Sequence, residues 1–339
     1  MVDNIKIIPL LDTLRLQKID DSEYFSKKYS GYISNSRLSL INPKQDGSPE
    51  KFFNGFTFTY SPAFQIGSAV HELILQSDLF YLVDSVDKPT AKLGAIADEL
   101  YPIFKEKNIK DEDIINAAVK IDYYGGNLNQ NKIDNVLNSC TPYWTSRKQF
   151  ESTYSENKEL IYLDKKSREI VCNCVNALKS NKNIQNLLHP SSVIYEPISE
   201  NEQAILLDVE VEMPNGNNFI LSLKAKLDNY TVDFDTNTVI VNDVKTLGRV
   251  VSEMQNNISK FHYNREFAVY AYLLILCAQK YYNMFNLIVK GNYLVVSTIP
   301  NYYTKVISLT KRMYQEGFNE FKYLLRLVAY YYDKGYRFK

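Results

Sequence analysis

Cysteine and histidine, the usual ligands of zinc, are scarce in this chain. Its 339 residues include 4 cysteines and 3 histidines. Cys140, Cys172, Cys174 and Cys277 are scattered and form no disulfide framework. Cys172 and Cys174 lie two apart in a predicted helix, so they point to different sides and would not hold one metal ion. We expect reduced, mostly buried thiols and no Cys/His zinc site.

The chain also has no net charge and no long apolar run. Its 39 basic side chains balance 39 acidic ones, which excludes a broadly polybasic protein but not a local basic groove. No segment has the roughly 18 uninterrupted apolar residues of a membrane-spanning helix. The stretch AVYAYLLILCA (268–278) is bounded by charges and predicts a buried helix. With no secretory signal pattern at the N-terminus, we expect a cytoplasmic protein that does not bind membranes.

Hydrophobic residues make up 45% of the chain, enough for one large core or two ordinary domains. Residues 1–190 look mainly helical, with loops. Ser61 followed by Pro62 is typical of a helix start and predicts a helix through AFQIGSAVHELIL. Charged helical spacing also characterises residues 92–120 and 157–188.

Residues 191–339 have a different pattern, because β-rich runs alternate with turns. Four runs predict strands: SVIYEPIS, AILLDVEVEM, NFILSLKAKLDNYTVDF and NTVIVNDVKTL, with a clear turn at PNGNN (214–218). A helix over 251–282, a strand over 291–300 and a last helix over 309–334 follow. The sequence therefore predicts an α/β core.

Two acidic residues end neighbouring predicted strands. In VIVNDVKTLG (239–248), Asp243 and Lys245 share one face of a strand. Asp228 ends the preceding strand, so a hairpin can set the two carboxylates side by side. Carboxylate oxygens suit Mg²⁺, and a lysine beside them can hold a water or offset charge on a phosphorane-like transition state. A D-x-K match alone arises about once by chance in a chain of this length, and Asp164–Lys166 is a second match.

Four further residues could belong to this site. His71 lies one helical turn after Gly67, although most histidines in such a place are structural. Glu196 stands where a strand is predicted to begin. Glu266 and Tyr270 are four apart and share a helix face, where a hydrogen bond between them could be simple packing.

Together these motifs resemble the PD-(D/E)XK nuclease superfamily. G-S-A-V-H-E-L (67–73), Asp228, N-D-V-K-T (242–246) and E-F-A-V-Y (266–270) follow the order of the RecB-like branch, in particular the phage and prophage exonucleases of the RecE (exonuclease VIII) and lambda type. The stretch SRLSLINP (36–43) is similar to the serine-rich motif of that branch. The correspondence is poorest over 90–190.

The resemblance implies a restriction-endonuclease-like core, a mixed central sheet flanked by helices. The mainly helical region over residues 1–190 would contribute the His71 helix, and residues 191–339 the nuclease core, as one integrated catalytic domain. His71, Asp228, Asp243 and the backbone carbonyl of Val244 would bind Mg²⁺, with Mn²⁺ as a substitute.

The resemblance also assigns roles around the metal. Lys245 would orient the attacking water, Glu196 would support the site, and Tyr270 would position the lysine or contact DNA. Glu266 departs from the glutamine usual in the family, which leaves its role open. The backbone of the DNA would be held by Lys224, Lys226 and Arg265. The alternative for these cations is a solvated strand edge.

The implied activity is a Mg²⁺-dependent DNA exonuclease of phage or prophage origin. It would resect linear duplex ends from 5′ to 3′ for recombination, with a single-strand annealing protein as partner, in the cytoplasm of the host cell. Relatives form homo-oligomeric rings. Two alternatives stay open: an endonuclease of the same fold, and an inactive nuclease-fold module that only binds DNA or protein.

Overall fold

The chain divides into two compact units, in a computed structural model that describes residues 5–55 and 61–338. Unit 1 comprises Met1–Thr57, Lys179–Ser297 and Tyr303–Lys339, and unit 2 comprises Phe58–Leu178 and Thr298–Tyr302. The N-terminal segment therefore packs with the C-terminal half of the chain. Among the described residues, no helix is both long and apolar enough to cross a membrane.

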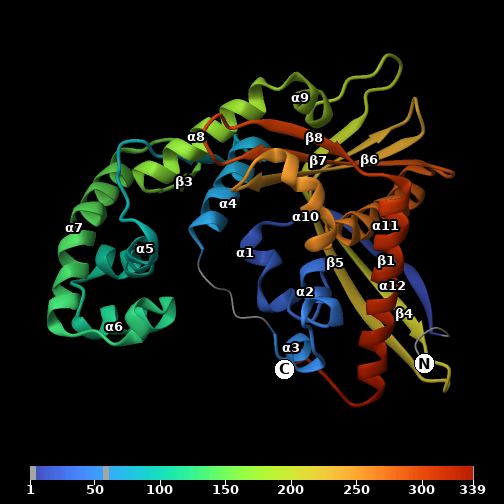
Figure 1. The fold of residues 1–339 in the computed structure, drawn as a ribbon, viewed down its shortest axis with the longest axis horizontal. Helices are drawn as coiled ribbons and strands as arrows, with labels where there is room; N and C mark the ends of the chain where they lie inside the picture. Colours follow the sequence, from blue (N-terminus) through green and yellow to red (C-terminus); the bar gives the residue numbers. More distant parts are fainter. Residues whose placement is uncertain (1–4, 56–60, 339) are drawn as a thin grey trace. The chain divides into compact units, whose positions relative to one another are not determined.

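Unit 1 is built on a six-stranded mixed sheet flanked by helices (Figure 1), as the sequence predicted. The strands lie in the order β1 (Lys6–Lys18), β4 (Ile198–Glu212), β5 (Asn218–Asp233), β6 (Thr238–Leu247), β7 (Ile288–Ser297) and β8 (Thr304–Ser308). Neighbours are antiparallel except β6 and β7, which are parallel.

Strand β1 differs from the mainly helical N-terminal region that the sequence indicated. Residues Lys6–Lys18 pair with β4 at the edge of the sheet, with a register shift between Leu10 and Arg15. Pro9 is compatible with this place, because an edge strand need not donate every N–H to a neighbour.

Two long helices of unit 1 bury the main core against the sheet. Helices α11 (Tyr263–Tyr282) and α12 (Lys311–Asp333) lie side by side (Figure 1). Gly291 on β7 allows α11 to approach, because a Cβ there would lie 1.9 Å from the Phe267 ring. Short helices complete the unit: α1 (Asp21–Tyr24), α2 (Asn35–Ser39), α3 (Pro49–Asn54), α9 (Lys182–Leu188) and α10 (Met254–Lys260).

The last helix of the chain is confirmed, but the single helix predicted over 251–282 is wrong. A short turn at Val251–Glu253 and α10 precede α11, and His262 between them has φ 55°. Its Nδ1 lies 2.9 Å from Glu320 Oε2 of α12. This side-chain contact and the left-handed backbone end one helix and start the next.

The strand predicted for SVIYEPIS is also wrong, because strand β4 begins only at Ile198. The backbone N–H groups of Ile194 and Tyr195 donate to the Asp235 carboxylate instead of to a neighbouring strand. Pro197 has no N–H to donate. The segment is therefore a loop fixed by one aspartate.

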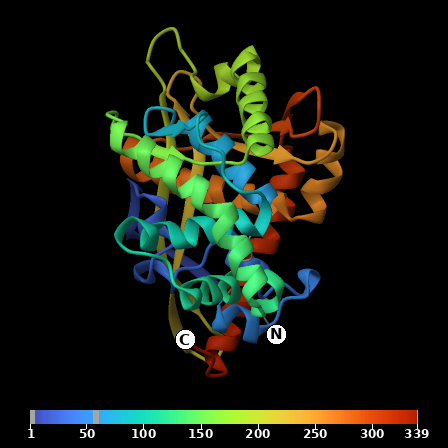
Figure 2. The same ribbon diagram turned by 90° about the vertical axis from the view of Figure 1, so that its left-hand side faces the viewer.

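Unit 2 is mainly helical (Figure 2). It contains α4 (Pro62–Leu75), α5 (Ala91–Glu106), α6 (Asp111–Ile121), α7 (Gln130–Thr153), most of α8 (Lys165–Ser180), and the parallel strands β2 (Phe80–Leu82) and β3 (Glu159–Ile161). Trp144 of α7 is buried and donates from Nε1 to the Ala97 carbonyl of α5 at 2.8 Å. Pro62 occupies the first turn of α4, as predicted.

Candidate active site

Asp228 and Asp243 occupy facing positions on strands β5 and β6. The register pairs Asn229 with Asn242, so the next residues along each strand, Asp228 and Asp243, lie opposite each other. Side chains at such positions share one face of a sheet. Asp228 Oδ2 also accepts the backbone N–H of Val244 at 2.8 Å. The carboxylate thus satisfies a backbone donor at the point where the strand pairing ends.

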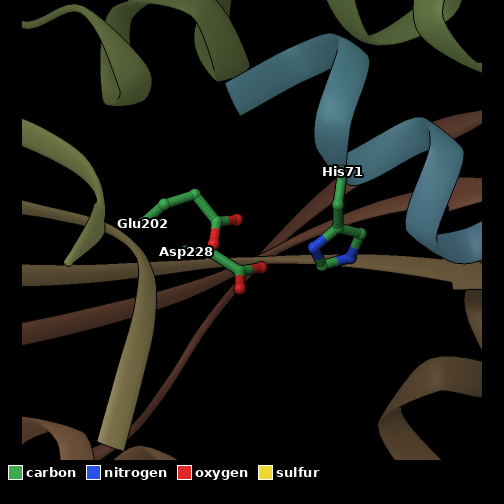
Figure 3. Close-up of side chains that lie close together, drawn as sticks. All are labelled: His71, Glu202 and Asp228. Carbon is green, nitrogen blue, oxygen red and sulfur yellow. The ribbon is translucent and has the colours of Figure 1, made fainter. Parts of the chain in front are cut away.

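Glu202 adds a third carboxylate from strand β4. The pairs Asn201–Asn229 and Gln203–Leu227 place it opposite Asp228. Carboxylate oxygens of Glu202 and Asp228 lie within 4.8 Å of each other (Figure 3). Glu202 has φ 55°, which is uncommon for a residue with a side chain. Three neighbouring strands therefore contribute one acid each to a single row.

The sequence pattern indicated Glu196 as the supporting acid and did not indicate Glu202. Glu196 is exposed in the loop before β4 and lies outside this row. The PNGNN turn could have predicted the position of Glu202, because it sets the register of the two strands by pairing Glu212 with Asn218. Ten residues further along each strand, the same register pairs Glu202 with Asp228.

Lys245 lies between two carboxylates. Its Nζ is 2.7 Å from Asp243 Oδ2 and 3.2 Å from Glu266 Oε2. Burial alone would lower the pKa of this ammonium group, but Asp243, Glu266 and Asp228 outweigh it, so the pKa rises well above 10.5. Lys245 is therefore a fixed positive charge at neutral pH.

Helix α11 contributes the second carboxylate beside Lys245, that of Glu266, and a tyrosine that bonds to it. Tyr270 donates from its hydroxyl to Glu266 Oε1 at 3.5 Å, and Glu266 in turn faces Lys245. Burial, reinforced by the charge of Glu266, raises the pKa of Tyr270 well above 10, so its hydroxyl stays protonated. The glutamate stands between the tyrosine and the lysine, and links the helix to β6.

The three carboxylates of the row outnumber the two lysines, Lys226 and Lys245, that pair with them. Burial raises the pKa of both Asp228 and Asp243, Lys245 counteracts this, and neighbouring carboxylates raise it further. At the Glu202 end of the row, Lys226 Nζ lies 2.8 Å from Glu202 Oε2 and 2.5 Å from Asp21 Oδ1. A bound cation would relieve the remaining repulsion, since opposite charge favours the ionised carboxylates.

The three cations expected to hold DNA have other partners. Arg265 is 0% exposed and donates to Asn35 Oδ1 at 2.8 Å. Lys224 is 8% exposed and donates to the Tyr24 carbonyl at 2.7 Å. Lys226 is paired as described above. Because these groups serve packing and ion pairing, we do not assign them to DNA binding.

The buried ammonium of Lys224 gives a pH-dependent prediction. Burial, together with Arg37, lowers the pKa of Lys224 from 10.5 to about 8. The folded chain therefore holds fewer protons than the unfolded chain between pH 8 and 10.5, and this lysine adds stability as pH rises through that window. We expect Lys224→Met to remove this gain, on the order of 2 kcal/mol. Urea unfolding of both proteins at pH 7.5 and 10 measures it, and parallel pH profiles would contradict it.

His71 lies on helix α4 of unit 2 and is partly buried. Its imidazole is labelled in Figure 3. The predicted role as a metal ligand is developed below as part of the proposal.

No family model and no curated protein matches the chain. Among solved structures, it is similar to the crystal structure of a "Putative exonuclease" from Eubacterium rectale, with 11% identity and a TM-score of 0.44 over 91% of this chain and 86% of that one.

Proposed function

We propose that the chain is a Mg²⁺-dependent deoxyribonuclease that degrades linear duplex DNA as an exonuclease. One observation carries the proposal: Glu202, Asp228 and Asp243 form a row across three strands, and Lys245 pairs with the last of them. Acids on adjacent strands followed by a lysine are what metal-assisted phosphodiester hydrolysis needs. The motif resemblance described above supports the same reaction.

The donor atoms of the row fit Mg²⁺, which prefers carboxylate and carbonyl oxygens. We propose Asp228, Asp243 and Glu202 as ligands. The Val244 carbonyl is a further candidate, because in a strand it points to the same side as the N–H that Asp228 accepts. The motif resemblance adds His71 to the proposed ligands.

The metal would supply Lewis acidity and an acidified water. The ammonium of Lys245 would orient that water and stabilise the negative charge that develops on the phosphoryl oxygens. Glu266 and Tyr270 hold the lysine in place from α11. Lys226 holds the Glu202 carboxylate by its Oε2 atom.

Degradation of a linear duplex, labelled at its 5′ or 3′ ends, tests this function in the presence of Mg²⁺ or EDTA. We expect metal-dependent loss of linear DNA, with 5′ label released first, and no cutting of a closed circular duplex. Cutting of the circle would indicate an endonuclease. Binding without cleavage would indicate a DNA-binding module. By resemblance, the product strand would serve a single-strand annealing protein, and the enzyme would assemble as a ring.

Replacement of His71 tests the proposed histidine ligand. We expect His71→Asn to raise the Mg²⁺ concentration for half-maximal cleavage about tenfold, as expected for loss of one metal-site interaction. His189→Asn is the matched control, because His189 is exposed at the end of α9 and should leave the metal requirement unchanged. An unchanged Mg²⁺ requirement in the His71 variant would remove this residue from the metal site.

A further inference from the structure

A row of hydrogen-bonded side chains, four amides and one serine hydroxyl, crosses five strands of the sheet and is called the amide row below. Each member bonds to its register partner on the next strand, and the row consists of Asn201, Asn229, Asn242, Asn292 and Ser308. The Nδ2 groups of Asn229 and Asn242 donate to the preceding amide oxygen at 2.8 Å. Asn292 Nδ2 donates to Asn242 Oδ1 at 2.9 Å, and Ser308 Oγ donates to Asn292 Oδ1 at 2.8 Å.

The three central amides of this row are buried. Asn229 and Asn242 are 0% exposed and Asn292 is 7% exposed. Asn242 has a second bond, to the Leu187 carbonyl of α9 at 3.0 Å, and Asn229 has one to Ser199 Oγ at 3.2 Å. All bonds along the row run in the same direction, from β8 towards β4. Satisfied buried networks of this kind hold their members in one arrangement.

The amide row is adjacent in sequence to the carboxylate row on every strand they share. Asn201 precedes Glu202, Asn229 follows Asp228, and Asn242 precedes Asp243. On β6, alternation puts the Asn242 amide and the Asp243 carboxylate on opposite faces. A slip of one residue would exchange these faces and would leave buried amides without partners.

We propose that the amide row positions the candidate metal site, by fixing the register that sets Glu202, Asp228 and Asp243 opposite one another. This inference rests on the proposed metal-binding function. In this role Asn229 and Asn242 are positioning residues, because they act through the carboxylates beside them. Replacing both with leucine removes the bond between them as a pair. It also leaves the buried Asn292 Nδ2 group and the Leu187 carbonyl without these partners, so we expect a folded variant of lower stability than the native chain.

Mn²⁺ affinity, measured by electron paramagnetic resonance on the full chain, tests the proposal. We expect the double variant Asn229→Leu, Asn242→Leu to bind Mn²⁺ at least tenfold more weakly than the native chain, the loss typical when partners behind metal ligands are removed. Thr238→Val is the matched control, because Thr238 is a buried polar residue on the same face of β6, outside the row. Leu325→Ala in α12 should lower the unfolding midpoint and leave Mn²⁺ affinity unchanged.

Two outcomes would overturn the proposal in distinguishable ways. Equal Mn²⁺ affinity in the native chain and the double variant would overturn the positioning role alone. Failure of the native chain to bind Mn²⁺ would overturn the proposed function and this inference with it. If the double variant does not fold, Ser308→Ala tests the proposal instead. Ser308 is exposed at the end of the row, so this replacement should not prevent folding. We expect a two- to threefold weaker affinity there, and unchanged affinity would count against the row.

Discussion

Replacing Asp243 with asparagine should abolish DNA hydrolysis, with an expected loss of about a thousand-fold. The asparagine keeps the size of the side chain but removes the negative charge that would hold the cation. It also leaves Lys245 with Glu266 as its nearest acid. The rate of release of labelled nucleotides from linear duplex DNA under saturating Mg²⁺ measures the effect.

Asp164→Asn is the matched control for this variant. Asp164 begins the second D-x-K sequence of the chain, but its carboxylate accepts the backbone N–H groups of Lys166 and Ser167 at the start of α8. We expect native activity and little change in helix stability, because asparagine caps a helix about as well as aspartate does. Native activity in the Asp243 variant would show that the site is not catalytic.

Lys245→Met should separate catalysis from metal binding. Methionine fills part of the space of the lysine stem but cannot orient water or offset charge on phosphate. We therefore expect cleavage to fall by at least about a hundred-fold. Mn²⁺ affinity should be kept or increased, because the ammonium no longer competes for the Asp243 carboxylate.

The same variant should be less stable without metal. Asp243 and Glu266 would lose their buried partner, which typically costs about 3–5 kcal/mol. The loss should shrink as pH falls, because burial raises the pKa of Asp243 and this carboxylate becomes protonated. It should also shrink with added Mn²⁺. Urea unfolding at pH 5 and 8 measures both effects. Lys224→Met provides the comparison, since it should leave cleavage unchanged, and a Lys245 variant with native cleavage would contradict the assigned role.

Most strands of the sheet and much of the candidate site could be predicted from the sequence, because strands and turns depend on local patterns. The alternation in VIVNDVKT put Asp243 and Lys245 on one face of β6, and the turns on either side of β5 set the register of three strands. Helix α11 was visible as an apolar run between charges.

What the sequence did not show depended on contacts between distant residues. Strand β1 acquires its structure by pairing with β4, about two hundred residues away in the chain. Arg265 looked like a surface cation, but Asn35, Ser39 and Glu320 surround it in the fold. Glu202 was not predicted, because its proposed role follows from the residue opposite it on β5 and not from its own neighbours in sequence.

The position of Lys245 between Asp243 and Glu266 has a consequence for how the protein matures. In the metal-free chain this ammonium group acts as an internal counter-ion, since it neutralises part of a carboxylate cluster that burial would otherwise penalise. If the site binds a divalent cation as proposed, folding and metal binding can be separate events. The chain could then fold where metal ions are scarce and bind the cation later.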